Sequence, residues 1–217
     1  MATDVVLLGP PGAGKGTQGE RIAAALGVPK IATGDVLRAA VREGTPLGLE
    51  AKAAMDRGDL VPDAVILGIM KETLAAPAAA NGSVLDGVVR TEPQAEGLAG
   101  ALGDLGRAVT AVLLFEVDDD ELVRRLGGRT VCDRCQTPYT GREPGTSCER
   151  CGGVLVRRKD DEPEAIRNRL AVYQGQTAPV IDWYRRAGTP LLTIDAIGAV
   201  DDVTARALDA LRRVRAG

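Results

Sequence analysis

One short stretch near the start of the chain restricts the fold more than any other feature. Residues 5–8 form an apolar run typical of a buried strand, and Gly9-Pro-Pro-Gly-Ala-Gly-Lys-Gly-Thr17 follows directly, ahead of a helical pattern. The segment from Gly9 to Lys15 has the G-x-x-x-x-G-K spacing of a phosphate-binding loop. Its glycines let backbone N–H groups point at an anion at the positive end of the next helix. A plain glycine-rich turn is the competing interpretation, but the strand, the lysine and the helix together favour a phosphate site.

Composition excludes several classes of protein. The chain has 217 residues, enough for one α/β core with small insertions, and its net charge of −3 favours neither nucleic acid nor an anionic membrane. No apolar segment approaches a membrane span and no signal-peptide pattern is present, so we expect a soluble cytoplasmic protein. The chain has no histidine, which excludes histidine bases and ligands. Lysine, arginine, carboxylates and a metal remain, and these suit phosphoryl transfer.

Apolar runs and turn residues predict a regular alternation of strands and helices. Five strands are expected, at residues 5–8, 28–32, 83–86, 110–117 and 190–195. Helices are expected between them, at residues 18–26, 36–43, 47–57, 63–75, 92–105, 118–126, 163–175, 178–187 and 200–214. This alternation is typical of an α/β fold with a doubly wound, parallel, five-stranded sheet. Trp183 and Tyr184 share one of these helices with apolar neighbours, which indicates packing.

A cysteine-containing insertion interrupts this pattern at residues 128–161, which are poor in aliphatic side chains. All four cysteines fall there, as two C-x-x-C pairs at Cys132, Cys135, Cys148 and Cys151. This spacing predicts a closed four-thiolate site for structural zinc, whose binding would supply folding energy that the insertion cannot obtain from apolar burial. Disulfides, free thiols and another metal remain as alternatives, although a cytosolic protein disfavours disulfides.

Taken in order, these motifs resemble those of bacterial adenylate kinases of the long type, which carry a zinc-bearing lid. The likeness covers nearly all of the chain and rests on residues 9–17, Thr33-Gly-Asp-Val-Leu-Arg38, Leu85-Asp-Gly-x-x-Arg-Thr91 with Gln94, Gly128-Arg129, Cys132 to Cys151, and Arg158-Lys-Asp-Asp161 with Arg167 and Arg169. The resemblance implies a nucleoside monophosphate kinase fold with two small inserted lobes. Its core would be residues 1–31, 62–127 and 162–217, its AMP-binding lobe residues 32–61, and its zinc-bearing lid residues 128–161.

The resemblance also implies roles for individual positions. Those on the ATP side are Gly12, Ala13, Gly14, Lys15, Gly16, Thr17, Arg129, Pro138, Tyr139 and Gly198. Those on the AMP side are Thr33, Arg38, Asp59, Leu60, Val61, Gly87, Val88, Val89, Arg90, Gln94, Arg158 and Arg169. Those implied in catalysis are Lys15, Asp86, Arg90, Arg129, Arg158 and Arg169, with Asp86 placed to hold Mg²⁺ through water. Asp160 and Asp161 would hold the arginines of the lid or its hinge.

The expected chemistry agrees with the residue types. Passing a phosphoryl group between two nucleotides gathers negative charge, and arginine offers a planar fork of donors that stays charged. The phosphate of AMP is already ionised, so the reaction needs no general base, in agreement with the absence of histidine. Closing lobes edged by glycine and proline would exclude water.

Two segments depart from the family pattern. Val88-Val89 stands where the family usually has Phe-Pro, and we expect a trans peptide bond before Val89 because a cis bond there would cost about 2.5–4 kcal/mol. The smaller Val88 predicts weaker AMP binding with the phosphate contacts kept. The arm between Cys135 and Cys148 is also short. Within it, Tyr139 either contacts the ATP base or ribose or packs on the metal loop, two interpretations that the sequence favours equally.

Other functions remain open at this level. A kinase of UMP, CMP or GMP has the same overall motifs, although the Thr33 and Gln94 pair favours AMP. A zinc-ribbon protein that binds nucleic acid is a third alternative, weakened by Tyr139 being the lone aromatic residue among the arginines of the insertion. The expected partners are therefore ATP, AMP and ADP, with no nucleic acid and no membrane, and the resemblance implies a monomer.

Overall fold

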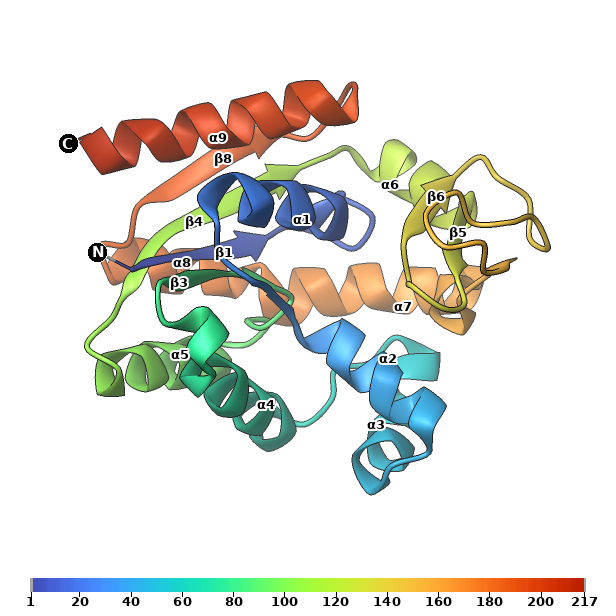
Figure 1. Ribbon diagram of the computed structural model, residues 1–217, viewed down its shortest axis with the longest axis horizontal. Helices are drawn as coiled ribbons and strands as arrows, with labels where there is room; N and C mark the ends of the chain where they lie inside the picture. The colour runs from blue at the N-terminus through green and yellow to red at the C-terminus, as the bar shows by residue number, and fades with distance from the viewer. Residues whose placement is uncertain (1, 217) are drawn as a thin grey trace.

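A parallel five-stranded sheet organises the protein (Figure 1), whose computed structural model describes residues 2–216. The strand order is β2–β3–β1–β4–β8, and every pairing is parallel. The strands are β1 (Thr3–Leu8), β2 (Lys30–Ala32), β3 (Gly82–Asp86), β4 (Val109–Glu116) and β8 (Leu191–Asp195). The predicted α/β class and five-stranded parallel sheet are confirmed.

Helices connect the strands and cover both faces of the sheet. They are α1 (Lys15–Leu26), α2 (Thr33–Glu43), α3 (Pro46–Arg57), α4 (Asp63–Ala75), α5 (Glu92–Asp104), α6 (Asp119–Gly127), α7 (Pro163–Val172), α8 (Pro179–Arg186) and α9 (Val200–Ala216). Short 3₁₀ turns at Pro77–Ala79 and Lys159–Asp161 were not predicted. The first two helices begin three residues earlier than predicted. Helix α1 starts at Lys15 directly after Gly14, whose φ is 87°, and α2 starts at Thr33 directly after Ala32, the last residue of β2.

The alternation of side chains along the central strands explains the two layers. Val6 and Leu8 of β1 face a core cluster shared with α4, α5 and α8, whereas Val5 and Leu7 face a second cluster shared with α1 and α9. In β4, Phe115 is fully buried on the α1–α9 side. A strand that is apolar on both faces is what a sheet covered on both sides requires.

Helices α7 and α8 form a nearly continuous rod along one face of the sheet (Figure 1). A π-helical segment at Tyr173–Thr177 joins α7 to α8, so the break predicted near residue 176 is a change of helix type. On α8, Tyr184 is fully buried and Trp183 packs edge-on against it, with ring centroids 5.0 Å apart, which confirms the packing interpretation.

Residues 128–161, here called the lid segment, form a separate small sheet beside the end of α6 (Figure 1). Its antiparallel strands are β5 (Arg129–Cys132), β6 (Pro138–Thr140) and β7 (Leu155–Val156), in the order β6–β5–β7. No strands were predicted there, because each is too short to show a periodic pattern. The lid segment and the α2–α3 pair project from the same side of the core, away from the start of β1 and the end of α9 (Figure 1).

Two further expectations concern the backbone and the membrane. No cis peptide bond occurs within residues 2–216, which confirms the trans geometry expected before Val89. Among the helices of this described part, none has the length and apolar character needed to span a membrane.

Candidate active site

The loop between β1 and α1 has the shape of an anion cradle, and its glycines are required by that shape. Gly9, Gly12 and Gly14 have φ values of 139°, 88° and 87°, in the region that disfavours side chains. A Cβ on Gly9 would also lie only 2.6 Å from the Phe115 carbonyl oxygen of β4. The loop then leads directly into α1 at Lys15, so the positive end of that helix faces the cradle.

The Lys15 side chain extends back along the loop. Its Nζ donates hydrogen bonds to the carbonyl oxygens of Gly9, at 2.6 Å, and Pro10, at 2.8 Å. Desolvation lowers the pKa of Lys15 to about 8, against the opposing effect of Asp86 and with help from nearby arginines. The cleft therefore holds a cation whose charge is only partly balanced, which is a physical reason for it to bind an anion.

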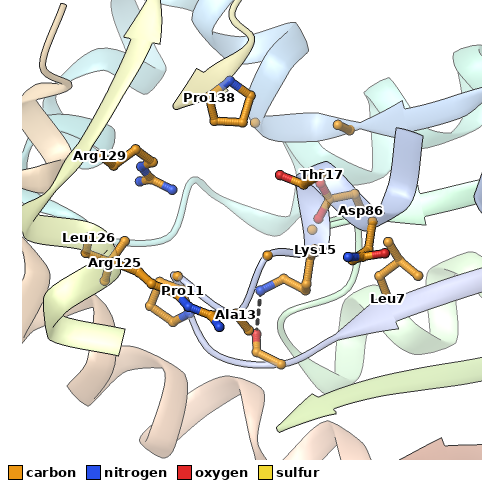
Figure 2. Close-up of a pocket in the computed structure, with 18 of the residues that line it drawn as sticks. Leu7, Pro11, Ala13, Lys15, Thr17, Asp86, Arg125, Leu126, Arg129 and Pro138 are labelled. Carbon is orange, nitrogen blue, oxygen red and sulfur yellow. Dashed lines mark hydrogen bonds between the residues drawn. The ribbon is translucent and has the colours of Figure 1, made fainter. Parts of the chain in front are cut away.

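A cleft of about 460 Å³ opens over this loop. All the residues predicted to be catalytic line it: Lys15, Asp86, Arg90, Arg129, Arg158 and Arg169. They come from α1, the carboxyl end of β3, the lid segment and α7, so segments far apart in the sequence meet at one place. Figure 2 shows Arg129 and Pro138 of the lid segment on the side of the cleft opposite Lys15, Thr17 and Asp86.

A smaller cavity of about 60 Å³ adjoins the cleft under α2 and α3. Thr33, Asp59, Leu60, Val61 and Gln94 line it, and it shares Arg38, Gly87, Arg90 and Arg169 with the large cleft. Most of the residues predicted for the two nucleotides thus lie around two adjoining cavities, and Arg38, Arg90 and Arg169 line both.

Two aspartates hold the arginines of the cleft. Asp161, only 4% exposed, accepts hydrogen bonds from Arg129, with Nε and Oδ2 2.7 Å apart, and from Arg169, with Nη1 and Oδ1 3.0 Å apart. Asp160 pairs with Arg169, with Nη1 and Oδ2 3.0 Å apart. Asp161 thus holds Arg129 of the lid segment, as expected, whereas the ion pair of Asp160 is with Arg169 of α7.

Other arginine donors in the cleft are buried without a partner. Arg38 Nε and Arg158 Nε have no hydrogen-bond acceptor within the described part of the chain. Desolvation, reinforced by neighbouring arginines, lowers the pKa of Arg158 to about 9 and that of Arg90 to about 10. Buried, unsatisfied donors are costly, so an anionic ligand that accepts from them would be strongly favoured.

Thr33 and Gln94 are already hydrogen-bonded within the protein. The Thr33 hydroxyl donates to the Gly87 carbonyl oxygen at 2.7 Å. The Gln94 side chain donates to Asp63 Oδ1 at 2.7 Å and accepts from the Arg90 backbone N–H at 2.8 Å. Both residues are almost fully buried, so they form the wall of the small cavity with a single orientation.

Among the remaining predicted residues, Gly12, Ala13, Gly14, Gly16, Thr17, Pro138, Val89 and Gly198 line the large cleft. Two predicted residues do not line either cavity. Val88 is fully buried in the core cluster beneath α4 and α5. The Tyr139 hydroxyl lies 3.2 Å from Cys148 Sγ, which agrees with the interpretation that it packs on the metal loop.

Sequence reasoning missed Arg125, which also lines the cleft. Its Nη2 donates to the Ala196 carbonyl oxygen at 2.9 Å, and its Nε lies 2.6 Å from Glu121 Oε1. On the sequence, Glu121 and Arg125 look like an ordinary i,i+4 ion pair on a helix surface. Glu20 and Lys30 line the cleft as well and were likewise missed.

The four cysteines of the lid segment converge as the spacing predicted. Their sulfurs all lie within 4.8 Å of one another, with Cys132 and Cys151 3.4 Å apart and Cys135 and Cys148 3.6 Å apart. A disulfide needs sulfurs about 2.05 Å apart, whereas tetrahedral thiolates around zinc lie about 3.8 Å apart. The geometry and the donor set therefore fit a tetrahedral metal ion and contain no disulfide.

The loop also offers oxygen ligands suited to Mg²⁺. Thr17 and Asp86 lie on the same side of Lys15 (Figure 2). Asp86 Oδ2 would be 3.5 Å from a Cβ placed on Gly16, so the carboxylate stands directly beside the loop. A hydroxyl and a carboxylate, completed by phosphate oxygens and water, are ligands that Mg²⁺ prefers.

Comparison with known proteins agrees with this geometry. Residues 7–189 match the sequence model of the adenylate kinase family. The chain is 71% identical over 210 residues to an adenylate kinase of Gemmatimonas aurantiaca, covering 96% of this chain and 98% of that protein. It is 51% identical over 212 residues to one from Salinispora tropica (96% and 97% covered) and 47% identical over 204 residues to one from Methanosarcina barkeri (92% and 94% covered). The chain belongs to the adenylate kinase family.

Proposed function

We propose that this protein transfers the terminal phosphoryl group of Mg²⁺-bound ATP to AMP, giving two molecules of ADP. Family membership supplies the reaction. The observation in the structure that carries the proposal is that Arg38, Arg90, Arg129, Arg158 and Arg169 all line the cleft over the phosphate loop. The first two and Arg169 also line the adjoining small cavity. Such a set of cations suits a phosphate passed between two anionic molecules.

The large cleft is proposed to hold ATP. Backbone N–H groups of residues 12–17 would bind its phosphates, and Lys15 would exchange the carbonyl oxygens of Gly9 and Pro10 for phosphate oxygens. Pro138 and Gly198 would border the base and ribose. Mg²⁺, held through Thr17 and Asp86, neutralises phosphate charge when it is bound.

The small cavity is proposed to hold AMP. Arg38 and Arg90 would bind its phosphate, while Thr33 and Gln94 would orient the base along a wall completed by Asp59, Leu60, Val61, Gly87 and Val89. Arg129, Arg158 and Arg169 would stabilise the charge on the transferring group. The attacking phosphate oxygen carries no proton to remove, so no side chain has to act as a base.

Residues 32–61 and the lid segment are proposed to close over AMP and ATP, respectively, and to exclude water from the transfer. Zinc is the proposed metal of the lid segment, with a structural role because four cysteine ligands leave no open position. A monomeric state and a cytoplasmic location, expected from the resemblance, are part of the same proposal and can be checked by sedimentation and by fractionation of cells.

The test is ADP formation from ATP with each of AMP, UMP, CMP and GMP as acceptor. We expect AMP to be the preferred acceptor, and Lys15→Ala to lower kcat by about 10²–10³-fold, as loss of one preorganised charge donor does. The melting temperature of Lys15→Ala would show that the fold is kept. Equal or better turnover with another monophosphate would contradict the proposed substrate, and unchanged turnover in Lys15→Ala would contradict the proposed site.

A further inference from the structure

A row of alternating charges connects the lid segment to the α2–α3 pair across the core. It consists of Arg150, Glu20, Lys30, Asp35 and Arg38, here called the charged row. Arg150 Nη1 lies 3.5 Å from Glu20 Oε2, and Glu20 Oε1 lies 3.7 Å from Lys30 Nζ. Lys30 Nζ lies 3.5 Å from Asp35 Oδ2, and Asp35 Oδ1 accepts from Arg38 Nη2 at 2.6 Å. The row starts in one proposed closing lobe and ends in the other.

Each end of the row belongs to a site already described. Arg150 stands between Cys148 and Cys151, and its Nη1 lies 3.4 Å from Thr137 Oγ1, which lies 3.1 Å from Cys135 Sγ. At the other end, Arg38 carries the buried Nε that has no partner and lines both cavities. The second and third members, Glu20 on α1 and Lys30 on β2, stand on the core and line the large cleft.

Packing holds Lys30 in its place in the row. Its side chain is only 15% exposed, and its stem runs along α1 at Gly19. A Cβ on Gly19 would be 3.2 Å from Lys30 Cδ, so the glycine makes room for the stem. Burial alone would raise the pKa of Asp35, but Arg38 and then Lys30 hold that pKa below its ordinary value. Lys30 therefore acts on the same carboxylate that orients Arg38.

We propose that Glu20 and Lys30 are positioning residues that couple closure of the lid segment over ATP to the availability of Arg38 for the phosphate of AMP. When Arg150 pairs with Glu20, Glu20 attracts Lys30 less strongly, and Lys30 is freer to engage Asp35. Asp35 then competes less for Arg38, whose donors become available to an anion. The inference rests on the proposed function, because it assigns AMP to Arg38 and ATP to the lid side.

The test measures AMP affinity by calorimetry, with and without a non-hydrolysable ATP analogue. The ratio of the two affinities is the coupling factor, which must be the same in both directions. We expect the analogue to tighten AMP binding in the parent protein. In Lys30→Met and in Glu20→Gln we expect the coupling factor to fall by about two- to fivefold, the range for partly exposed ion pairs.

Glu20→Gln separates this proposal from a general field effect. Removing a negative charge from the wall of the cleft would, by the field alone, tighten both nucleotides and leave their coupling unchanged. The charged row instead predicts weaker coupling. Glu149→Gln is the matched control, because Glu149 neighbours Arg150 but pairs with Arg142 within the lid segment. We expect it to keep the coupling of the parent.

Two results would overturn the inference. One is an unchanged coupling factor in both Lys30→Met and Glu20→Gln, and the other is an active parent protein that shows no coupling. A parent protein that makes no ADP from ATP and AMP would instead contradict the proposed function. Melting curves of each variant identify a loss of affinity caused by unfolding, and Glu20→Gln, on an exposed position, keeps the test available if Lys30→Met is unstable.

Discussion

The core and the lid segment achieve their folded structures by different physical means. Beneath the phosphate loop, strand β4 is buried on both faces, and Phe115 and Leu113 are fully enclosed among residues of α1, α6 and α9. In the lid segment the buried cluster contains only Cys132, Cys148 and Leu155, with Cys135 and Tyr139 partly buried against it. Apolar burial can stabilise the first region, whereas the second has a small buried cluster, and we expect a metal bound by its four cysteines to supply the missing stabilisation.

This difference matches what each region does. The core must hold Lys15 and the arginines close together before an anion arrives, which is electrostatically unfavourable and requires a rigid scaffold. The lid segment is proposed to close over ATP as a unit, and a metal held by its two C-x-x-C loops would give it rigidity without a large core. We therefore expect the two regions to respond differently to metal, to mutation and to pH.

Metal removal has the largest expected effect on the lid segment and should spare the core. Structural zinc contributes on the order of 10 kcal/mol in small zinc-dependent folds, so chelation under reducing conditions should unfold residues 128–161 and abolish ADP formation. Limited proteolysis with mass analysis should then show cuts between Cys132 and Cys151, while core fragments stay intact. If the metal-free lid segment resists the protease as well as the metal-bound protein does, the lid segment does not need a metal to fold, and the contrast with the core is wrong.

Removal of a large buried side chain from the core should have the opposite effect, because it should destabilise the core and spare the lid segment. Phe115→Ala should lower the free energy of unfolding of the core by about 3–5 kcal/mol, because it leaves a cavity in a fully packed layer. The matched variant in the lid segment, Leu155→Ala, should leave the main denaturant transition almost unchanged and increase protease cleavage of the lid segment instead. Equal loss in the main transition would mean that the two regions unfold as one cooperative unit.

The phosphate site makes core stability depend on pH in a way that the lid segment does not share. The folded pKa of Lys15, about 8, lies below the ordinary lysine pKa of 10.5, so the folded state binds fewer protons than the unfolded state between these pH values. The penalty is complete below pH 8 and disappears as pH rises to about 10.5. As pH rises through this window, the free energy of unfolding of the parent protein should increase by about 1–3 kcal/mol relative to that of Lys15→Met. This range already allows for screening of the lysine charge by solvent in the cleft.

Denaturant unfolding at pH 7.5 and pH 10 measures this difference, with the exposed Lys71→Met as control. Groups that titrate in both proteins cancel in the comparison. A constant difference in stability between the parent and Lys15→Met across the window would show that Lys15 is not desolvated in the folded protein.

The smallest expected effect concerns the two hydroxyls beside the cysteines. The hydrogen bond between the Tyr139 hydroxyl and Cys148 lowers the pKa of that thiol, which favours its thiolate as a metal ligand. Tyr139→Phe should therefore release zinc to a chelating dye about tenfold faster, and Thr137→Val should do the same through Cys135. The KM for ATP should stay unchanged in Tyr139→Phe. A raised KM with unchanged zinc release would assign Tyr139 to the nucleotide instead.

Local patterns were sufficient for much of the architecture. Strands β1 and β4 were predictable because short apolar runs bounded by turn residues are compatible with few structures other than a buried strand. The phosphate loop was predictable because its φ values demand glycine at set positions, and the cysteine site because metal ligation requires close spacing. The lid strands were missed, since segments of two to four residues carry no periodic signal.

What the sequence determined by itself is the α/β class, the phosphate loop, the four-cysteine site and, through its motifs, the family. The tertiary structure alone decided that Tyr139 turns to Cys148, that Val88 is enclosed in the core, and that Arg125, Glu20 and Lys30 reach the cleft. The physical reason is the separation along the sequence over which each kind of interaction acts. Turn chemistry and metal spacing act between neighbours in sequence, whereas the direction of a side chain and its charge partners depend on packing between segments, such as Arg150 and Glu20, that lie 130 residues apart.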